Sequence, residues 1–336
     1  MHAINRRAFT IGAIACPFVL SAKAAEPEIR ARQFHNQPTE SHQHQYLVDL
    51  WRAVREETGG KIDVTVVPQN GGVAGGDPAV LDMLVQGEVE FFTLTGGLVS
   101  RIVPVMDIQG LPFAFSTPQQ VHQANDGALG AYLSRECAAK GIHRFQFGLL
   151  ENGFKHISMV DKPINTADDL AAMRIRVPAG KLYEDMYRTL GANPVVLNFN
   201  QMAAAFKEKR IDGQENPLVI TEVNKLYEYT KYMSLTSHSW TGFNLLANLA
   251  FWQKLSPEWQ AIIDRNVKKY VALQREAAQQ LNSSLEPKLK ERGMIFNVAD
   301  TDSFRKKLAE GFYARWKEQL GAEAWQLLEA EVGRLG

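Results

Sequence analysis

The sequence is poor in cysteine, in long apolar runs and in excess charge of either sign. Its 336 residues include only two cysteines, too few for a cysteine-based zinc or iron–sulfur site. Lysine plus arginine and aspartate plus glutamate number 37 each, so no excess of positive charge indicates binding to nucleic acid. No segment has the roughly 20 consecutive apolar residues that a membrane-spanning helix needs. The sequence therefore predicts a globular protein that neither crosses a membrane nor binds nucleic acid.

Catalytic and cofactor motifs are also missing. The glycine-rich run NGGVAGG at residues 70–76 lacks the Lys-Ser/Thr pair of a phosphate-binding loop. There is no GxSxG nucleophile elbow and no HExxH zinc motif. His42 and His44 open a predicted helix, where residues two apart do not face each other, so we interpret them as a solvated helix start and not as a metal pair. The sequence gives no support to an enzyme, a cofactor or a metal site.

The first 24 residues have the pattern of an export signal. A basic start with Arg6 and Arg7 precedes a short apolar run, and a small-x-small motif ends at Ala24. The residues NRRAF resemble a twin-arginine signal, although an ordinary secretory signal could also contain two adjacent arginines. We expect cleavage near Ala24 and a periplasmic protein. Cleavage would leave Cys137 without a disulfide partner, and its helical spacing predicts a small, buried side chain.

Extended and helical segments alternate along the rest of the chain. Apolar residues on one stripe predict a helix over residues 42–57, and the alternating apolar residues of KIDVTVV predict a strand soon after it. A further helix, DPAVLDMLVQG, and an apolar strand, VEFFTLT, follow. This βα order is typical of an α/β unit with a mostly parallel sheet between helices, which we place over residues 25–150. A second unit begins near Asn152.

A long helix is predicted to begin after Ser256. Ser256 is placed to cap it and Pro257 to occupy its first position. Its apolar stripe continues for about 30 residues, well beyond an ordinary domain helix, so the helix can pass from one domain to another. Pro287 is expected to kink or end it. Two shorter amphipathic helices, at about residues 301–318 and 321–333, close the chain.

Two polar features lie where α/β folds bind ligands. The strand MRIRVP places Arg174 and Arg176 on the face opposite its apolar residues and ends at Pro178. Such an arginine could be an ion-paired surface residue, or it could hold a ligand carboxylate in two parallel hydrogen bonds. The second feature is DGQENP at residues 212–217, in which Asp-Gly and Asn-Pro are typical turn pairs. Turn chemistry alone does not explain the Gln-Glu-Asn between them.

Taken together, these two features resemble one transporter family. RVP, followed at this spacing by DGQENP and then by KLYEYTKYMSLTSH, is similar to the solute-binding subunits of tripartite ATP-independent periplasmic (TRAP) transporters of the DctP type. The upstream stretches GGDPAVLDMLVQGEVEFF and LPFAFSTPQQVHQANDGALG fit the same family. The resemblance covers nearly all of the chain that follows the signal peptide.

The resemblance implies an α/β fold built as a two-lobed clamp of the periplasmic-binding-protein kind. Mixed sheets, hinge strands between the lobes and a long helix spanning both lobes would be its main parts. Lobe I would comprise residues 25–151 and about 241–281. Lobe II would comprise residues 152–240 and about 282–336, including the C-terminal helices. The implied partners are a small organic acid and the membrane subunits of a TRAP permease, with no cofactor.

The same resemblance implies how a carboxylate is bound. Arg176 would pair with it, and Asn216 would face the cleft and donate its amide to it, while Pro217 would begin the next helix. Lys155 stands where the family usually has a second arginine, and a lysine keeps the charge but loses the planar fork. Phe199 resembles the aromatic residue that lies against the ligand, and an ordinary core position is an equal alternative.

Further candidates follow from their places at strand ends and in the second crossing between the lobes: Asn36, Thr95, His238 and Trp240. The identity of the acid stays open. Trp240, Phe199 and Phe113 would suit an aromatic or keto acid, whereas the asparagines and Lys155 would suit a hydroxylated or sugar acid.

Our hypothesis is a clamp that closes on a carboxylate and delivers it to a TRAP permease. A periplasmic sensor that presents its ligand to a signalling kinase would share the clamp, and neighbouring permease genes would distinguish the two. A periplasmic enzyme exported by the twin-arginine route is the other alternative. An absorbing cofactor or a metal in the purified protein would favour it.

Overall fold

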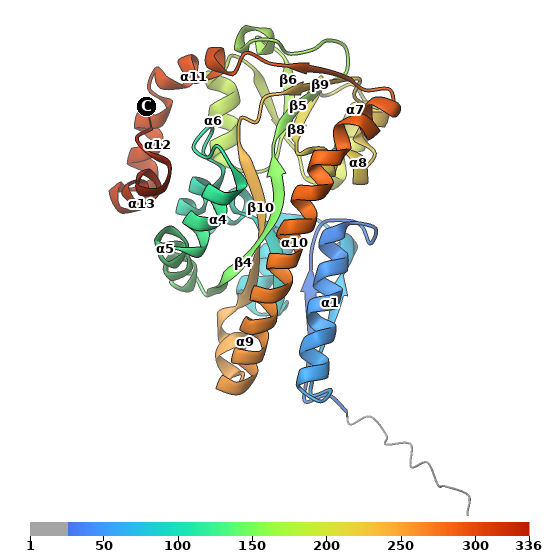
Figure 1. Ribbon diagram of the computed structural model, residues 1–336, viewed down its shortest axis with the longest axis vertical. Coiled ribbons are helices and arrows are strands. Elements are labelled where there is room, and N and C mark those ends of the chain that lie inside the picture. Colours follow the sequence, from blue (N-terminus) through green and yellow to red (C-terminus); the bar gives the residue numbers. More distant parts are fainter. Residues whose placement is uncertain (1–25, 336) are drawn as a thin grey trace, which may run out of the picture.

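The computed structural model describes residues 26–335, which form two β-sheets connected by crossing strands (Figure 1). The predicted signal peptide, its cleavage site and Cys16 lie outside these residues. The α-helices are α1 (His42–Glu57), α2 (Asp77–Gln86), α3 (Gly96–Val99), α4 (Pro118–Asp126), α5 (Ala128–Ala138), α6 (Lys181–Thr189), α7 (Met202–Lys207), α8 (Leu218–Val223), α9 (Leu249–Lys254), α10 (Pro257–Glu291), α11 (Thr301–Ala309), α12 (Phe312–Leu320) and α13 (Ala322–Val332). Short 3₁₀ helices are η1 (Pro68–Gly72), η2 (Pro104–Gly110), η3 (Ala167–Leu170), η4 (Phe199–Gln201) and η5 (Leu226–Glu228).

Both sheets are mixed. The first has the order β2 (Ile62–Val67), β1 (Ile29–Phe34), β3 (Phe91–Thr95), β10 (Trp240–Asn248), β4 (Ile142–Phe154). Strand β1 is parallel to β2 and β3, whereas β10 is antiparallel to β3 and β4. The second sheet has the order β11 (Ile295–Val298), β9 (Tyr232–Leu235), β5 (His156–Met159), β8 (Gly213–Asn216), β6 (Arg174–Val177), β7 (Asn193–Val196). The predicted α/β clamp with mixed sheets is confirmed. In the first sheet, only β2, β1 and β3 form the parallel arrangement that was expected for residues 25–150.

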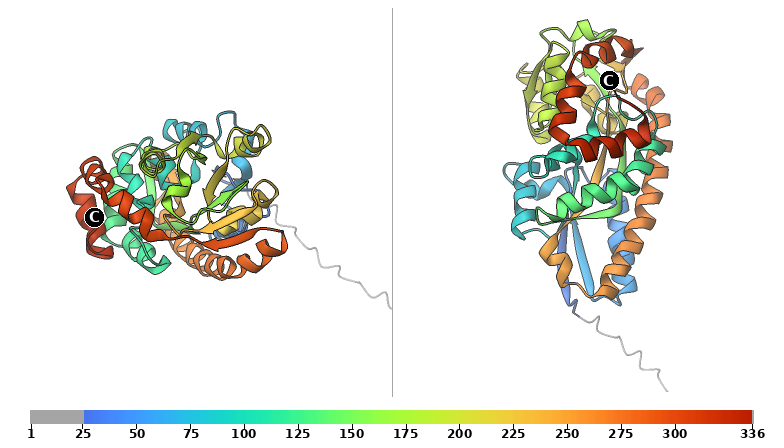
Figure 2. Two further views of the ribbon diagram at one scale, coloured as in Figure 1. Left: turned by 90° about the horizontal axis from the view of Figure 1, so that it is seen from above. Right: turned by 90° about the vertical axis from the view of Figure 1, so that its left-hand side faces the viewer.

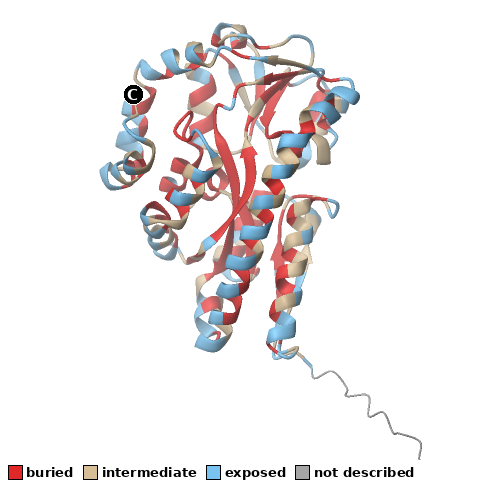
Figure 3. Ribbon diagram, viewed as in Figure 1, coloured by how far each residue is buried: buried red, intermediate tan, exposed pale blue. Residues whose placement is uncertain are grey.

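Strands β4 and β10 connect the two sheets. Strand β4 ends one residue before β5 of the second sheet, and β10 follows β9 of that sheet after a short connection. Both cross the middle of the molecule, where they are buried for nearly their whole length (Figure 3). Their pairing is interrupted between Thr241 and Gly242 and between Asn244 and Leu246, where β-bulges bend the strands.

Helix α10 spans both halves of the molecule along one side (Figures 1 and 2). It packs on β4 and α1 of the first half and on α8 of the second. Ser256 caps it, since its side chain accepts a hydrogen bond from Trp259 N, as expected. Pro287 does not end it, because the buried Leu285 and Leu289 hold its last turn against the core.

Several other sequence predictions are confirmed. Helix α1 has the predicted bounds. Cys137 is fully buried, which raises the pKa of its thiol to about 12. Of the two predicted C-terminal helices, the one at about residues 321–333 is confirmed as α13, which packs against α4 and α5 of the first half. The one at about residues 301–318 is instead divided into α11 and α12, with Gly311 in a left-handed conformation between them. None of the helices within residues 26–335 combines the length and the apolar character that crossing a bilayer requires.

The turns predicted at the Asp-Gly and Asn-Pro pairs of DGQENP are wrong, because Gly213 and Asn216 are the first and last residues of a strand. Gly213–Asn216 form β8, a buried strand that lies between β5 and β6 of the second sheet. The strand is stable despite its polar side chains because buried groups on neighbouring elements bind them. Pro217 ends the strand and caps α8, so the expected helix start is confirmed there.

Replacing Gly213 by alanine should destabilise the fold. A Cβ at this position would lie 2.2 Å from Met159 Sδ and 2.7 Å from Ser158 O, on the adjacent strand β5. Overpacking of this kind costs about 1–3 kcal/mol. Urea unfolding of Gly213→Ala and of the wild type would measure the loss. An unchanged unfolding midpoint for Gly213→Ala would show that β5 shifts without penalty.

Candidate functional site

The candidate site is a small cavity between the two sheets, of about 50 Å³, that adjoins a wider groove of about 520 Å³. Asn36, Asp77 and Phe199 line both spaces. The ends of β1, β3, β6 and β8 meet here, as expected for a ligand site of an α/β fold. Of the predicted site residues, the inner cavity brings together six: Asn36, Thr95, Lys155, Arg176, Phe199 and Asn216.

Arg176 is the main positive group that faces this cavity without a carboxylate partner. Its side chain is 3% exposed, and its Nε and Nη2 donate to Leu197 O at 3.1 and 2.7 Å. These bonds orient the guanidinium, and no described residue binds its Nη1. Burial lowers the pKa of Arg176 to about 10, although the charges of Glu215 and Asp77 oppose that change, so it stays protonated at neutral pH. The group is therefore a charged donor fixed in place before any ligand arrives.

Asn216 lies beside Arg176 on the neighbouring strand and is held by a chain of hydrogen bonds. Its Nδ2 donates to Gln214 Oε1, and Gln214 Nε2 donates to Ser158 Oγ at 2.6 Å. The alternation of a strand places Gln214 and Asn216 on the same face. This chain fixes the Asn216 amide in the cavity wall and leaves its second N–H available to a ligand oxygen.

Lys155 also lines the cavity, but its charge is already paired. Its Nζ lies 2.6 Å from Glu215 Oε1 and 3.5 Å from the centre of the Tyr183 ring. His238 Nε2 lies 3.0 Å from Glu215 Oε2, so Lys155 and His238 hold one buried carboxylate between them. Burial raises the pKa of Glu215, but the charge of Lys155 and the hydrogen bond with His238 outweigh it and keep the pKa below its usual value. Glu215 also lines the cavity, and Lys155 and His238 compensate its charge there.

The structure places His238, Trp240 and Phe113 outside the cavity wall. His238 is bound to Glu215 and, through Nδ1, to Thr236 Oγ1 at 2.7 Å. Phe113 packs against Phe304, with ring centres 6.5 Å apart. Direct ligand contacts by these three residues stay a prediction.

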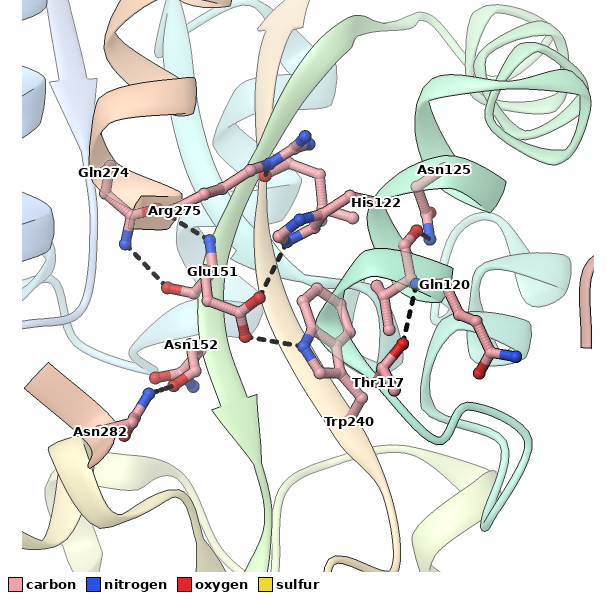
Figure 4. Close-up of polar contacts among 12 residues, drawn as sticks. Thr117, Gln120, His122, Asn125, Glu151, Asn152, Trp240, Gln274, Arg275 and Asn282 are labelled. Atoms are coloured by element: carbon pink, nitrogen blue, oxygen red, sulfur yellow. Dashed lines mark hydrogen bonds and ion pairs between the residues drawn. The ribbon is translucent and has the colours of Figure 1, made fainter. Parts of the chain in front are cut away.

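Trp240 belongs to a polar network that joins the hinge strands to α10 (Figure 4). Its Nε1 donates to Glu151 Oε1 at 2.7 Å, and Glu151 Oε2 lies 2.8 Å from His122 Nε2. The side-chain amide of Gln274 on α10 bonds both backbone groups of Glu151, each at 2.8 Å. Trp240 thus ties β10 to β4 at the point where both strands cross between the sheets.

The histidines near the start of α1 are not solvated as predicted. His42 Nε2 contacts Gln274 Nε2 of α10 at 2.8 Å, because α10 covers this end of α1. His44 Nδ1 lies 2.9 Å from His35 Nε2. Within residues 26–335 no group of three or more His, Cys, Asp or Glu side chains is arranged to hold a metal ion.

His35 should make the stability of the protein depend on pH. It is fully buried directly before Asn36, and burial, followed by the charge that His44 can carry, lowers the pKa of His35 to about 3. The unfolded chain takes up a proton near pH 6.5, whereas folded His35 stays neutral until about pH 3. The unfolding free energy should therefore fall as pH decreases through this window, by up to about 1.4 kcal/mol per pH unit from this residue.

Urea unfolding at pH 7.5, 6 and 5 would measure this slope in the wild type and in His35→Gln. We expect a shallower slope in the variant, because its side chain does not titrate. Equal slopes in the two proteins would show that His35 does not contribute.

Sequence reasoning missed several residues of the cavity wall, among them Asp77, Asn152 and Thr241. Asp77 opens helix α2, where an acidic residue is usual, so its position in sequence gave no sign of a ligand role. Asn152 lies within β4 at a bulge that no sequence pattern indicates. Its side chain is turned into the cavity by that bulge.

The chain is similar to known proteins in family, sequence and structure. Residues 34–319 match the family described as bacterial extracellular solute-binding protein, family 7 (DctP). A protein of Sinorhizobium fredii is 30% identical over 209 residues, which are 62% of this chain and 38% of that protein, so the chain spans well under half of this relative. The C4-dicarboxylate-binding protein DctB of Bacillus subtilis is 26% identical over 242 residues, 72% of this chain and 68% of that protein.

Among solved structures, the sugar acid binding protein DctPAm of Advenella mimigardefordensis, in complex with galactonate, has the same fold. Its TM-score is 0.85 at 26% identity, with 91% of this chain and 98% of that chain covered. The predicted resemblance and the predicted clamp fold are both confirmed. Because the family match extends over most of the sequence, this chain belongs to bacterial extracellular solute-binding protein family 7, the DctP family.

Proposed function

We propose that this protein captures a small organic acid in the cavity between its lobes and delivers it to a TRAP-type membrane permease. The observation that carries the proposal is the buried guanidinium of Arg176, which faces a cavity and has no carboxylate partner among residues 26–335. A ligand carboxylate can supply that partner in two parallel hydrogen bonds. The family consists of solute-binding proteins, which agrees with this reading.

Closure of the two lobes is the proposed mechanism. Lobe I would consist of residues 25–151 and about 241–281, and lobe II of residues 152–240 and about 282–336. The ligand would bridge Arg176 and Asn216 of one lobe to Asn36 and Thr95 of the other. It can favour the closed form only by binding that form more tightly than the open one. Expelling water from the cavity strengthens each charged hydrogen bond and supplies this difference.

The proposed location is the periplasm, after removal of a signal peptide near Ala24. The proposed partner is the membrane part of a TRAP permease, which would bind the closed form. Neither assignment requires a cofactor.

Mass spectrometry of the purified protein, before and after mild unfolding and dialysis, would identify a retained acid, and calorimetry would measure its rebinding. We expect one small carboxylate per chain. Failure to bind any organic acid in calorimetry, with a folded protein, would contradict the proposal.

A further inference from the structure

Asp77 places a negative charge in the wall of the cavity that is proposed to bind an acid. It is 4% exposed and lines both the inner cavity and the wider groove. Its Oδ1 accepts a hydrogen bond from Asn70 Nδ2 at 2.7 Å, and its Oδ2 accepts one from Asn36 Nδ2 at 3.0 Å. A carboxylate has about four acceptor positions, so each oxygen keeps one for a ligand. The side-chain amides of Asn70 and Asn36 fix the orientation of the Asp77 carboxylate and so of its remaining acceptor positions.

Two further buried acceptors lie along the same walls. Asn70 is 5% exposed and lines the groove, and its Oδ1 has no hydrogen-bond partner among the described residues. Asn152 is 3% exposed and lines the inner cavity, and its Oδ1 also has no partner within residues 26–335. Asn152 is the extra residue of a bulge, because Gly153 pairs with Thr241 while Glu151 pairs with Gly242. Buried acceptors of this kind are costly unless a donor reaches them.

The walls of the site therefore carry two chemically different sets of groups. Arg176 and Asn216 offer N–H donors that suit one carboxylate. Asp77, Asn70 and Asn152 offer acceptors, and these suit hydroxyl groups. A second carboxylate beside these acceptors would bring no donor and would face the like charge of Asp77, which disfavours its binding.

We propose that the site selects a hydroxylated acid with a single carboxylate, and that Asp77 is the specificity-determining residue that rejects a second carboxylate. This inference rests on the proposed function, because it assumes that Arg176 binds the first carboxylate. It also chooses between two of the three relatives named above. It places this chain with the galactonate-binding protein of Advenella and apart from the C4-dicarboxylate-binding protein of Bacillus, although each is 26% identical to it.

Two matched pairs of acids test the inference in the wild-type protein by calorimetry. Galactonate and galactarate differ only in the last carbon, which carries a hydroxyl group in the first and a carboxylate in the second. Erythronate and meso-tartrate form the same pair with four carbons, so the test does not depend on chain length. In each pair, the acid with one carboxylate is called the single acid and the acid with two carboxylates its diacid. In at least one pair, we expect the single acid to bind at least tenfold more tightly than its diacid. Hexanoate, which has no hydroxyl groups, should bind at least tenfold more weakly than galactonate if the six-carbon pair binds.

Asp77→Asn should reduce the preference for the single acid over its diacid, since it removes the charge and replaces one acceptor by a donor. We expect the ratio of the two affinities to fall about tenfold, by weaker binding of the single acid and tighter binding of the diacid. Asp82→Asn is the matched control, because Asp82 is exposed on the same helix α2. Thermal unfolding of both variants would check that they fold. If Asp77→Asn does not fold, the affinity ratios of the wild type alone test the inference.

Three results would overturn the inference. One is the absence, in both pairs, of tighter wild-type binding of the single acid than of its diacid. Another is an unchanged ratio in folded Asp77→Asn. The third is tighter binding of 6-aminohexanoate than of either hydroxy acid, which would assign the acceptors to an ammonium group. Arg176-dependent binding of a diacid would leave the proposed function standing, whereas binding of no acid at all would contradict both.

Discussion

Replacing Arg176 by alanine should weaken binding of the organic acid by about 2–5 kcal/mol, which is roughly a 30- to 4,000-fold loss of affinity. The effect is large because the ligand carboxylate would be left in a buried cavity without its charged partner. The fold should survive, since among residues 26–335 Arg176 forms no ion pair and its side-chain hydrogen bonds go to Leu197 O. Arg176→Lys should bind with intermediate affinity, because a lysine keeps the charge but cannot form two parallel bonds.

Arg174→Ala is the matched control for this experiment. Arg174 lies on the same strand β6, but its side chain is exposed and pairs with Asp212 at the surface. An exposed pair of this kind contributes about 0–1 kcal/mol to stability, and none of its atoms reaches the cavity. Calorimetry should therefore show wild-type affinity for Arg174→Ala. Equal affinities of wild type and Arg176→Ala would remove Arg176 from the proposed role.

Replacing Lys155 by methionine should lower the free energy of unfolding by about 3–5 kcal/mol. The change keeps the size of the side chain and its packing on Tyr183, but it leaves the carboxylate of Glu215 buried with only His238 as a close partner. An uncompensated buried charge is the cause of the loss. Urea unfolding at neutral pH would measure it.

A second variant tests whether the charge of Glu215 is the cause. The double change Lys155→Met with Glu215→Gln removes both charges, so it should be more stable than Lys155→Met alone. Lys61→Met is a control, because Lys61 and Glu28 are both 55% exposed and their pair should contribute less than about 1 kcal/mol. If Lys155→Met were as stable as the wild type, the buried pair would not support this part of the fold.

Periodicity alone predicted the elements whose burial is one-sided. Helix α1 and the strand β2 follow from a regular spacing of apolar residues, and that spacing does not depend on distant partners. Strand β8 could not be predicted in the same way, because its four residues are polar or glycine and still buried. Its stability comes from Lys155, His238 and Ser158, which lie on other segments of the chain.

The candidate site was predicted only in part, because some of its residues gain their role from contacts that form after folding. Arg176 and Asn216 were found because the motifs around them resemble a family, not because their types are unusual at those positions. Asp77 was missed because an acidic residue at the start of a helix has an ordinary structural explanation. Its role depends on Asn36 and Asn70, which reach it from other loops only after folding.

A crystal structure of the protein with bound acid tests the central claim most directly. The acid should be the one that the purified protein retains or, if it retains none, the tightest binder among the four hydroxy acids and diacids. We predict that its carboxylate lies within about 3 Å of the Arg176 guanidinium and of Asn216 Nδ2, in the cavity between the two sheets. A ligand bound elsewhere, or one whose carboxylate faces away from Arg176, would contradict the account.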